Sequence, residues 1–401
     1  MEPENNNTKE RWIIDTDPGV DDLMAIIYVL NRPNTEVEFI SLVEGNCKMH
    51  DVTRNAKRLF KMLGKPIPTF IGCSRQLCHM SKNAYDYHYE DGFGNIDEIK
   101  EIDVTDIHFE FINKEKRNLK ENINFSLKEG NNYNKEINSE SLLFDPFRYS
   151  PIEIIKTVNK YPNQINLLML GPCTNLAAAY MLDNSIANKF KNIVMMGGSF
   201  LWRGNITSAA EFNINHDYLS AKVFLNNFKN FLFTCWEPTE FLFFNVSDLE
   251  KAKNIAVKRY NDYNDKLYKY LYLIIKKYTQ KRTGTQICDL YSIIAYFDKE
   301  SVLKYFLAEC DIIIDSDQFN GATILKNKFY LTDKSNNNNN NYVDLSILNG
   351  NYEYKNVLNK LYLNNKHLLK NNHIFVENMC VDRIIQNFSY ILKPIKDKVY
   401  L

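Results

Sequence analysis

The stretch that decides the fold is Trp12-Ile13-Ile14-Asp15-Thr16-Asp17-Pro18-Gly19-Val20-Asp21-Asp22, near the start of the 401-residue chain. Its apolar beginning is typical of a buried strand, and its end places four carboxylates within eight residues. A helix-period segment, residues 22–30, follows at once with its apolar side chains on one stripe. A strand that passes through a short polar loop into a helix predicts the first unit of an α/β sheet.

The same order of elements recurs along the chain. Four further apolar runs each end in small or polar residues, namely residues 37–43, 165–170, 193–196 and 231–233. Helix-period segments lie between some of them, at residues 52–63 and 176–181. We therefore expect an α/β fold with an open, mostly parallel sheet and helices on both faces. The polar residues that follow the strands should then share the carboxyl edge, where such sheets bind ligands.

Two stretches interrupt this pattern. Residues 101–149 are rich in Asn, Lys and Glu, and residues 333–363 contain the run Asn336 to Asn341. Both compositions predict low-complexity insertions that are solvated and mobile. The remainder predicts one large domain across residues 1–401, closed by a helical pattern at residues 376–392 that should pack back on the core.

Composition excludes several classes of protein. Lys plus Arg and Asp plus Glu both total 49, so the zero net charge argues against nucleic acid or an anionic membrane as partner. No apolar run approaches the roughly 18 residues that span a bilayer, and the polar N-terminus lacks a secretory signal. The eight cysteines include no C-x-x-C pair, so we expect reduced thiols in a cytoplasmic protein.

The acidic loop is the first candidate for chemistry. Four like charges this close repel one another unless a cation neutralises them, and hard carboxylate oxygens favour Ca²⁺ or Mg²⁺. A plainer interpretation is that Asp21 and Asp22 only cap the following helix, but this leaves Asp15 and Asp17 unexplained. The loop is not an EF-hand, because Pro18 breaks the alternation of ligands. Haloacid-dehalogenase-like phosphotransferases also carry Asp-x-Asp after their first strand, but they prefer Thr or Ser where this chain has Pro18-Gly19.

The segment from Ile14 to Asp22 resembles the N-terminal signature of the inosine–uridine-type nucleoside hydrolases. Further matches follow in order along the chain: Gly45-Asn46, Gly171-Pro172-Cys173-Thr174-Asn175-Leu176-Ala177, Met196-Gly197-Gly198, Gly204-Asn205 and Ala210-Glu211-Phe212-Asn213. The resemblance implies the fold of that family and Ca²⁺-dependent hydrolysis of the N-glycosidic bond of ribonucleosides to ribose and free base. It also implies a dimer or tetramer as a possible assembly.

The resemblance implies a metal site whose ligands are the carboxylates of Asp17, Asp22 and Asp289 and the backbone carbonyl of Leu170. Asp17 also matches the general base that takes a proton from the metal-bound water. That role agrees with elementary chemistry, because a cation lowers the pKa of water and an adjacent carboxylate can accept the proton. Asp15 matches a residue that supports the loop from behind.

The resemblance also implies which groups hold the ribose; they match Asp21, Asn46, Asn205, Glu211, Asn213 and Asp289. If the triplet 211–213 is extended, Glu211 and Asn213 share one face and Phe212 lies on the other. Breaking the glycosidic bond develops positive charge on the sugar, which clustered carboxylates and amides would stabilise.

The sequence departs from the family on the side of the base. Members active on uridine carry a His directly before the last ligand Asp, as leaving-group acid, and this chain has Cys288 there. Because a thiol is a poor substitute, we expect Cys288 to be a packing residue. His88 matches a second His near the base and becomes the candidate proton donor, kept protonated by nearby carboxylates.

These departures predict a preference for purine nucleosides such as inosine. The tyrosines Tyr85, Tyr87 and Tyr89 flank His88, and one of them is a candidate for stacking on a purine. A nucleoside-binding protein that has lost turnover is the non-catalytic alternative, which the position of Cys288 leaves open.

Overall fold

The computed structural model describes residues 9–64, 67–78, 88–105, 149–200, 203–229, 231–240, 242–280, 283–316, 318–332, 342–344 and 373–394. The described strands are β1 Glu10–Thr16, β2 Thr35–Leu42, β3 Thr69–Ile71, β4 Ile165–Met169, β5 Phe190–Met196, β6 Leu232–Thr234, β7 Val302–Ile312, β8 Thr323–Thr332, β9 Tyr342–Asp344 and β10 His373–Met379. The described α-helices are α1 Val20–Asn31, α2 Met49–Leu63, α4 Asp97–Lys100, α6 Ser150–Lys160, α7 Thr174–Leu182, α8 Phe212–His216, α9 Tyr218–Asn227, α10 Trp236–Glu240, α11 Val246–Tyr260, α12 Asp265–Thr279, α13 Cys288–Phe297 and α15 Val381–Phe388, with 3₁₀ turns η3 Asn184–Asn188 and η4 Lys299–Ser301.

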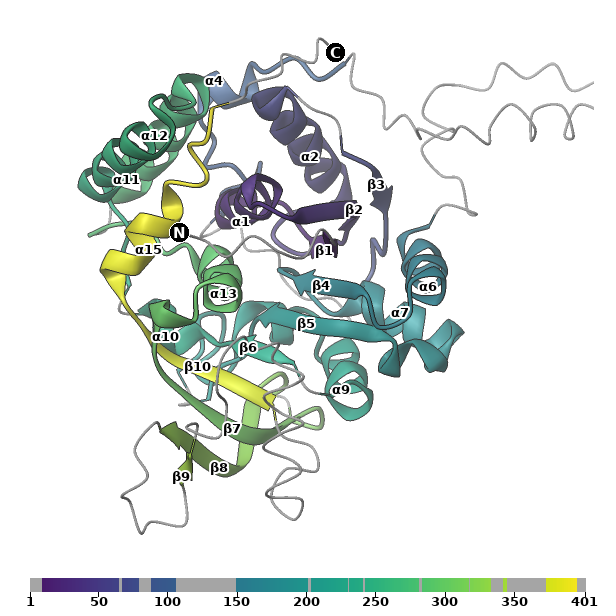
Figure 1. Ribbon diagram of the computed structural model, residues 1–401. Helices are drawn as coiled ribbons and strands as arrows, with labels where there is room; N and C mark the ends of the chain where they lie inside the picture. The colour runs from purple at the N-terminus through teal and green to yellow at the C-terminus, as the bar shows by residue number, and fades with distance from the viewer. Residues whose placement is uncertain are drawn as a thin grey trace, which may run out of the picture.

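The described strands form one sheet in the order β3-β2-β1-β4-β5-β6-β10-β7-β8-β9 (Figure 1). Neighbouring strands run parallel from β3 as far as β10. Strand β7 is antiparallel to both β10 and β8, and β9 is parallel to β8. The predicted α/β fold with a mostly parallel sheet is confirmed, and the strands and helices predicted before residue 234 coincide with β1, β2, β4, β5, β6, α1, α2 and α7.

Helices cover both faces of the sheet (Figure 1). Successive residues of a strand point to opposite faces, so each strand contributes to two cores. Ile14 and Leu168 join the core beneath α1, α2, α11, α12, α13 and α15. Their neighbours Ile13 and Leu167 join the second core beneath α6, α7 and α9. Since both faces are buried, the central strands are continuously apolar, which is why their sequences read as short apolar runs.

The C-terminal segment differs in part from its prediction. The helical pattern expected across residues 376–392 begins only at α15, and Val376 lies in strand β10. Val376 pairs with Thr234 of β6 on one side and with Tyr305 of β7 on the other. These pairing partners are distant in sequence, so the local pattern of apolar residues could not show that this segment is a strand.

The two predicted insertions are described only in small part. Residues 101–105 and Tyr149 are the two ends of the first one, and Tyr149 is the N-cap of α6. In the second, Tyr342–Asp344 forms β9 at the edge of the sheet, so this insertion contributes to the fold at that point. Residues 106–148, 333–341 and 345–363 lie outside the described residues, and the prediction for them is untested.

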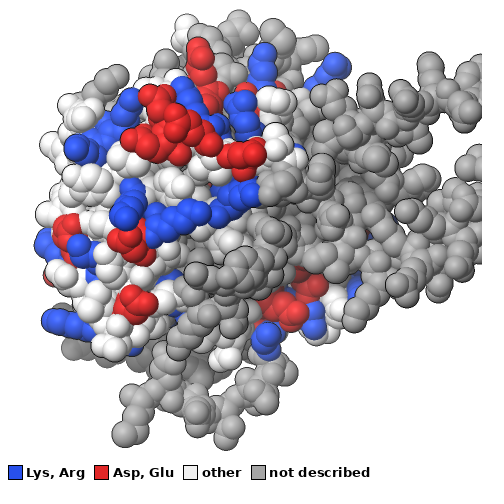
Figure 2. Space-filling view, turned by 90° about the horizontal axis from the view of Figure 1, so that it is seen from above, with Lys and Arg blue, Asp and Glu red and all other residues white. Residues whose placement is uncertain are grey.

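No described helix combines the length and the apolar character that crossing a membrane requires. On the face seen from above, groups of Lys and Arg lie beside groups of Asp and Glu (Figure 2). On that face, the described residues therefore form no broad patch of a single charge.

The C-terminal helix gives a test of the core. Phe388 is fully buried and stacks on Phe244 with ring centroids 4.3 Å apart. We expect Phe388→Ala to lower the free energy of unfolding by about 3–5 kcal/mol, because it removes an aromatic ring from a packed interior. Val381→Ala is the control on the same helix, and since Val381 is 47% exposed, its effect should stay within about 0.5 kcal/mol. Equal urea midpoints for the two variants would show that α15 is not part of the core.

Candidate functional site

The loops that follow the parallel strands meet at the carboxyl edge of the sheet. Asp17 directly follows β1, Leu170 directly follows β4, and Asn46 lies in the loop beyond β2. Backbone hydrogen bonds carry the strand pairing into these loops: the Leu170 amide donates to the carbonyl of Asp15 at 2.8 Å and the Val43 amide to that of Thr16 at 3.0 Å. The fold thus brings together residues that are far apart in the sequence.

Three buried carboxylates form a cluster at this edge. Asp21, Asp22 and Asp289 each offer one oxygen, and these oxygens lie within 4.8 Å of one another. Asp21 and Asp22 lie in the first turn of α1, and Asp289 lies in the first turn of α13, which packs against α1. Burial, and then the neighbouring Asp21, Asp22 and Asp17, raise the pKa of Asp289 well above its ordinary value. Such a group of like charges is suited to hold a cation.

Two oxygens beside this cluster support the same conclusion. Asp17 Oδ1 and Asp21 Oδ1 are buried, and neither has a hydrogen-bond partner among the described residues. A buried carboxylate oxygen without a partner is costly, whereas coordination of a metal ion would satisfy it. The atoms that could coordinate an ion are all carboxylate oxygens, so the residues present fit Ca²⁺ or Mg²⁺.

Asp17 lies beside the cluster of three, and neighbouring glycines make room for it. Its Oδ2 accepts the backbone N–H of Asn46 at 2.6 Å. A Cβ at Gly45 would lie 2.0 Å from Asp17 Oδ2, and one at Gly171 would lie 2.8 Å from Asp17 Oδ1. Burial, followed by the charge of Asp22, raises the pKa of Asp17 well above its ordinary value. The tight enclosure fixes where this carboxylate lies.

Asp22 is held by three donors. Its carboxylate accepts the hydroxyl of Thr16, the backbone N–H of Gly19 at 2.9 Å and the side-chain amide of Asn46 at 3.2 Å. The bond from Gly19 is the helix cap that the plainer interpretation of the sequence proposed. The capping role is therefore real, and Asp22 belongs to the carboxylate cluster as well.

Behind the loop, Asp15 belongs to a buried polar network. It accepts the hydroxyl of Ser41 and the side-chain amide of Asn175 at 2.7 Å, and burial raises its pKa to about 7. Asn175 also donates to the backbone carbonyl of Leu42 at 3.0 Å. Sequence reasoning gave no role to Ser41 or Asn175, although Ser41 is a single hydroxyl within an apolar run.

Leu170 and Asn213 are in direct contact. The side-chain amide of Asn213 donates to the Leu170 carbonyl at 2.7 Å and to the Met196 carbonyl at 3.3 Å. The predicted carbonyl ligand and a predicted ribose contact thus belong to one unit, which joins the ends of β4 and β5 to α8.

The triplet 211–213 does not form an extended segment, so the condition under which Glu211 and Asn213 would share one face is not met: Phe212 and Asn213 lie in helix α8. Glu211 is the N-cap of α8, and its carboxylate accepts the backbone N–H groups of Asn213 at 2.8 Å and Ile214 at 3.1 Å. A side-chain acceptor at the helix start satisfies amides that otherwise lack partners, which favours the helical turn. Asn205 is exposed, and its side-chain oxygen accepts the backbone N–H of Phe212 at 2.8 Å. Glu211 and Asn205 therefore position α8 in this structure.

His88 lies against the acidic loop, and its charge differs from the prediction. A Cβ at Gly19 would lie 2.7 Å from His88 Nδ1. Burial lowers the pKa of His88 to about 4, and the opposing effect of Asp22 is smaller. The expectation that carboxylates keep this ring protonated is wrong, because desolvation outweighs them. Of the flanking tyrosines, Tyr85 and Tyr87 lie outside the described residues, and the Tyr89 ring lies edge-on to Tyr278 at 6.0 Å.

Cys288 is the first residue of α13 and is buried beside Asp289. Burial, and then the charge of Asp21, raise the pKa of its thiol well above the ordinary value. The thiol is hydrogen-bonded to the side chain of Thr239. A neutral, buried sulfur in this place agrees with the packing role expected for it.

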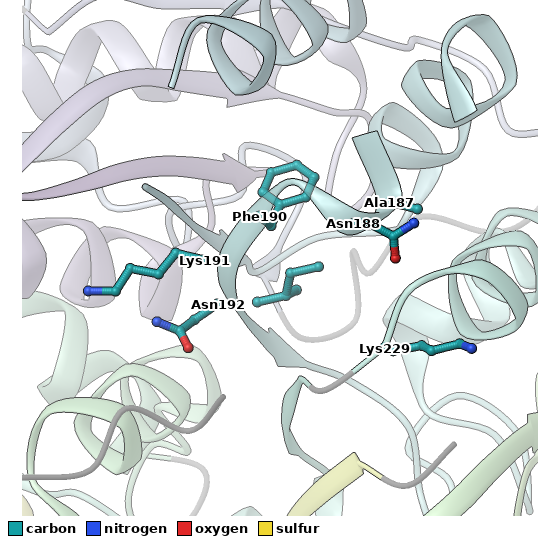
Figure 3. A pocket seen from close by; sticks show the side chains of 7 residues that line it. Ala187, Asn188, Phe190, Lys191, Asn192 and Lys229 are labelled. Carbon is teal, nitrogen blue, oxygen red and sulfur yellow. The ribbon is translucent and has the colours of Figure 1, made fainter. Parts of the chain in front are cut away.

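A separate hollow of about 90 Å³ lies near the start of β5, at the opposite edge of the sheet. Its lining includes Lys191, Asn192 and Lys229. The two lysine side chains point in opposite directions (Figure 3), so their charges do not converge on a common ligand. The carboxylate cluster remains the better candidate for a functional site.

Curated relatives of this chain are named as nucleosidases and nucleoside hydrolases. A probable uridine nucleosidase from Oryza sativa is 29% identical over 62% of this chain and 62% of its own length. Uridine nucleosidase 1 from Arabidopsis thaliana is 32% identical over 53% of this chain and 52% of its own. The inosine-uridine preferring nucleoside hydrolase from Crithidia fasciculata is 29% identical over 54% and 57%. The chain thus spans between about half and two thirds of the length of these relatives.

Solved structures share the fold. A plant nucleoside hydrolase has a TM-score of 0.64 at 22% identity, over 96% of this chain and 99% of that one. A purine-preferring ribonucleoside hydrolase from Gardnerella vaginalis has a TM-score of 0.66 at 19% identity, over 95% and 98%. The sequence model of the inosine-uridine preferring nucleoside hydrolases matches residues 12–349, from the first strand to beyond β9. The chain therefore belongs to the inosine-uridine preferring nucleoside hydrolase family.

Proposed function

We propose that this protein is a Ca²⁺-dependent ribonucleoside hydrolase that cleaves the N-glycosidic bond to give ribose and a free base, with purine nucleosides such as inosine preferred. The observation that carries the proposal is the buried cluster of Asp21, Asp22 and Asp289 beside Asp17, in a chain of this family. A cytoplasmic location and a dimeric or tetrameric assembly are parts of the same proposal. The family assignment argues against the phosphotransferase alternative, and measured release of ribose would exclude the alternative of a binding protein without turnover.

The residues that would hold the ion are Asp17, Asp22, Asp289 and the Leu170 carbonyl, with Asp21 close enough to take part. A bound Ca²⁺ would supply positive charge that lowers the pKa of an attacking water. Asp17 is the proposed proton acceptor, since its Oδ1 has no hydrogen-bond partner in the described part of the chain. Asp17 Oδ2 is fixed because it accepts the backbone N–H of Asn46. One oxygen therefore anchors the carboxylate, and the other is available to accept a proton.

The sugar side of the site combines fixed charges and amides. Asp21 Oδ1 has no hydrogen-bond partner within the described ranges, which suits a contact with a ribose hydroxyl. The proposed ribose contacts are Asp21, Asn46, Asn205, Glu211, Asn213 and Asp289. Negative charge held close to the anomeric carbon would stabilise the oxocarbenium-like transition state, and its effect is large because the site is buried.

The first prediction concerns the metal. Ca²⁺ added to stripped protein should bind with measurable heat and raise the melting temperature, since the unfolded chain cannot assemble the site; at about 100 times Kd the gain is about 2.7 kcal/mol. Asp289→Asn should weaken binding. The surface variant Asp262→Asn should not, because Asp262 is exposed and lies outside the cluster. No heat and no shift of the melting temperature in the unsubstituted protein would contradict the proposal.

The second prediction separates proton transfer from binding. Asp17→Ala should reduce kcat by at least about a thousandfold, because it removes the proton acceptor. Asn213→Ala should stay active, with kcat lowered only about tenfold. It removes the hydrogen bond to the Leu170 carbonyl and a proposed ribose contact, and it leaves the proton acceptor in place. Assays of released ribose measure both, and equal, mild effects would mean that the roles are wrongly assigned.

The third prediction concerns the base, where the names of relatives point in different directions. Several plant relatives are named for uridine, and a structural neighbour is named for purines. A pyrimidine needs a strong proton donor at the base. The buried Cys288 thiol is a weak acid, because burial raises its pKa, and His88 is neutral near pH 7, because burial lowers its pKa to about 4. A neutral imidazole keeps one N–H, which suffices to donate to a purine nitrogen.

We therefore expect the wild type to have a higher kcat/KM for inosine than for uridine. Cys288→His should raise activity on uridine relative to inosine. The control is Cys310→His, a change at a residue of β7 away from the cluster. A wild type that prefers uridine would refute the assignment of base preference and leave the proposed hydrolysis itself intact.

A further inference from the structure

Helix α2 carries two buried polar side chains on one face. Asn55 is fully buried and Arg58 is 4% exposed, and residues three apart lie side by side on a helix. An amide or a guanidinium in the interior is costly unless its hydrogen bonds are satisfied. The groups that these two residues contact therefore indicate why they are buried.

Asn55 joins two loops through a single amide group. Its Nδ2 donates to the carbonyl of Pro18 at 3.1 Å and to the carbonyl of Asp91 at 2.7 Å. Pro18 lies in the acidic loop directly after Asp17, and Asp91 lies three residues after His88. Because a side-chain amide has two N–H groups, both are used to connect these two backbones.

Arg58 reinforces the side of the connection that carries His88. Its guanidinium donates to Asn55 Oδ1 at 3.3 Å and lies 3.8 Å from Asp91 Oδ2. The other oxygen of Asp91 accepts the backbone N–H groups of Phe93 and Asn95, each at 2.9 Å. The loop 88–95 is thus closed on itself and fixed to α2.

The fit of this loop leaves little space. Gly92 has φ +77°, and a Cβ there would lie 2.6 Å from Asn55 Nδ2. At the other end, the ring of His88 lies so close to Gly19 that a Cβ would come within 2.7 Å of Nδ1. The Gly94 amide donates to the His88 carbonyl at 3.2 Å and couples the two ends.

We propose that Asn55 is a positioning residue, which fixes His88 against the acidic loop by bridging the carbonyls of Pro18 and Asp91. This inference rests on the proposed function only in that His88 serves the base of the nucleoside. The placement of His88 itself is measurable without any turnover.

The test is modification of histidines by diethyl pyrocarbonate in the full chain, followed by peptide mass spectrometry. The His50 side chain is 81% exposed and serves as the reactive reference, and His216 is 1% exposed and reports whether the fold stays closed. Asn55→Leu removes both N–H donors and keeps the bulk. It should raise the rate at His88 relative to His50 by about tenfold or more, because the loop opens locally, while His216 stays slow.

The matched control is Asn192→Leu, which removes another buried amide. Asn192 is 4% exposed, lines the hollow near the start of β5, and donates to Asn166 at 2.7 Å. This substitution removes a comparable buried hydrogen bond far from the acidic loop and from the loop 88–95. The modification rate of His88 relative to that of His50 should therefore not change. The proposal would be overturned if, in Asn55→Leu, His216 is still modified slowly and the modification rate of His88 relative to His50 is unchanged.

If His216 also becomes reactive in Asn55→Leu, Asn55→Asp decides the question. It removes both N–H donors to the Pro18 and Asp91 carbonyls and keeps an oxygen that accepts from Arg58. A rise confined to His88 supports the proposal, and any other pattern overturns it. In active protein, Asn55→Leu should lower kcat on inosine more than it changes Ca²⁺ affinity, since Asp22 keeps its donors from Thr16, Gly19 and Asn46. Protein that releases no ribose would refute the proposed function and leave the ratio of modification rates valid.

Discussion

Repulsion among buried carboxylates is the interaction on which the arrangement of this edge of the sheet depends. Asp21, Asp22 and Asp289 lie within reach of one ion, and each is buried. Two features of the fold partly offset the repulsion. Helices α1 and α13 both begin at the cluster, so the positive ends of their dipoles lie next to the negative charge. The donors to Asp22 come from the loops after β1 and β2, which the parallel strands bring together. A divalent cation could neutralise the negative charge that these helix ends and hydrogen-bond donors leave uncompensated.

The same constraint explains several small residues of the sequence. Around Asp17 there is no space for side chains at Gly45 or Gly171, so backbone encloses the carboxylate on two sides. Glycine at these positions reflects close approach, since neither has a positive φ. An enclosed carboxylate cannot turn away from its neighbours to reduce repulsion. The structure thus keeps Asp17 beside the carboxylate cluster, and the stability of the rest of the fold offsets the free-energy cost of its burial.

Local apolar patterns and motifs were enough to predict the strands β1, β2, β4, β5 and β6 and the helices α1, α2 and α7, all before residue 235. Apolar runs identified β1, β2, β4, β5 and β6 because the carboxyl-terminal parts of these strands are buried on both faces. Three features could not be predicted from local sequence. Strand β10 depends on partners in β6 and β7, the turn of α8 depends on capping by Glu211, and the neutral state of His88 depends on its burial. Each is decided by tertiary contacts, which a resemblance in short motifs does not contain.

The two sides of the site differ in how they are held. The carboxylate side rests on strand ends and helix starts, with backbone hydrogen bonds such as those to Asp22 and from Leu170. The side that carries His88 is fixed through one amide, Asn55, and one buried ion pair, Arg58 with Asp91. Asn55 is also where the two sides meet, because its amide donates to the carbonyl of Pro18 in the acidic loop as well as to that of Asp91. Substitution of Asn55 would change the second side, while Asp22 on the first side keeps its donors Thr16, Gly19 and Asn46.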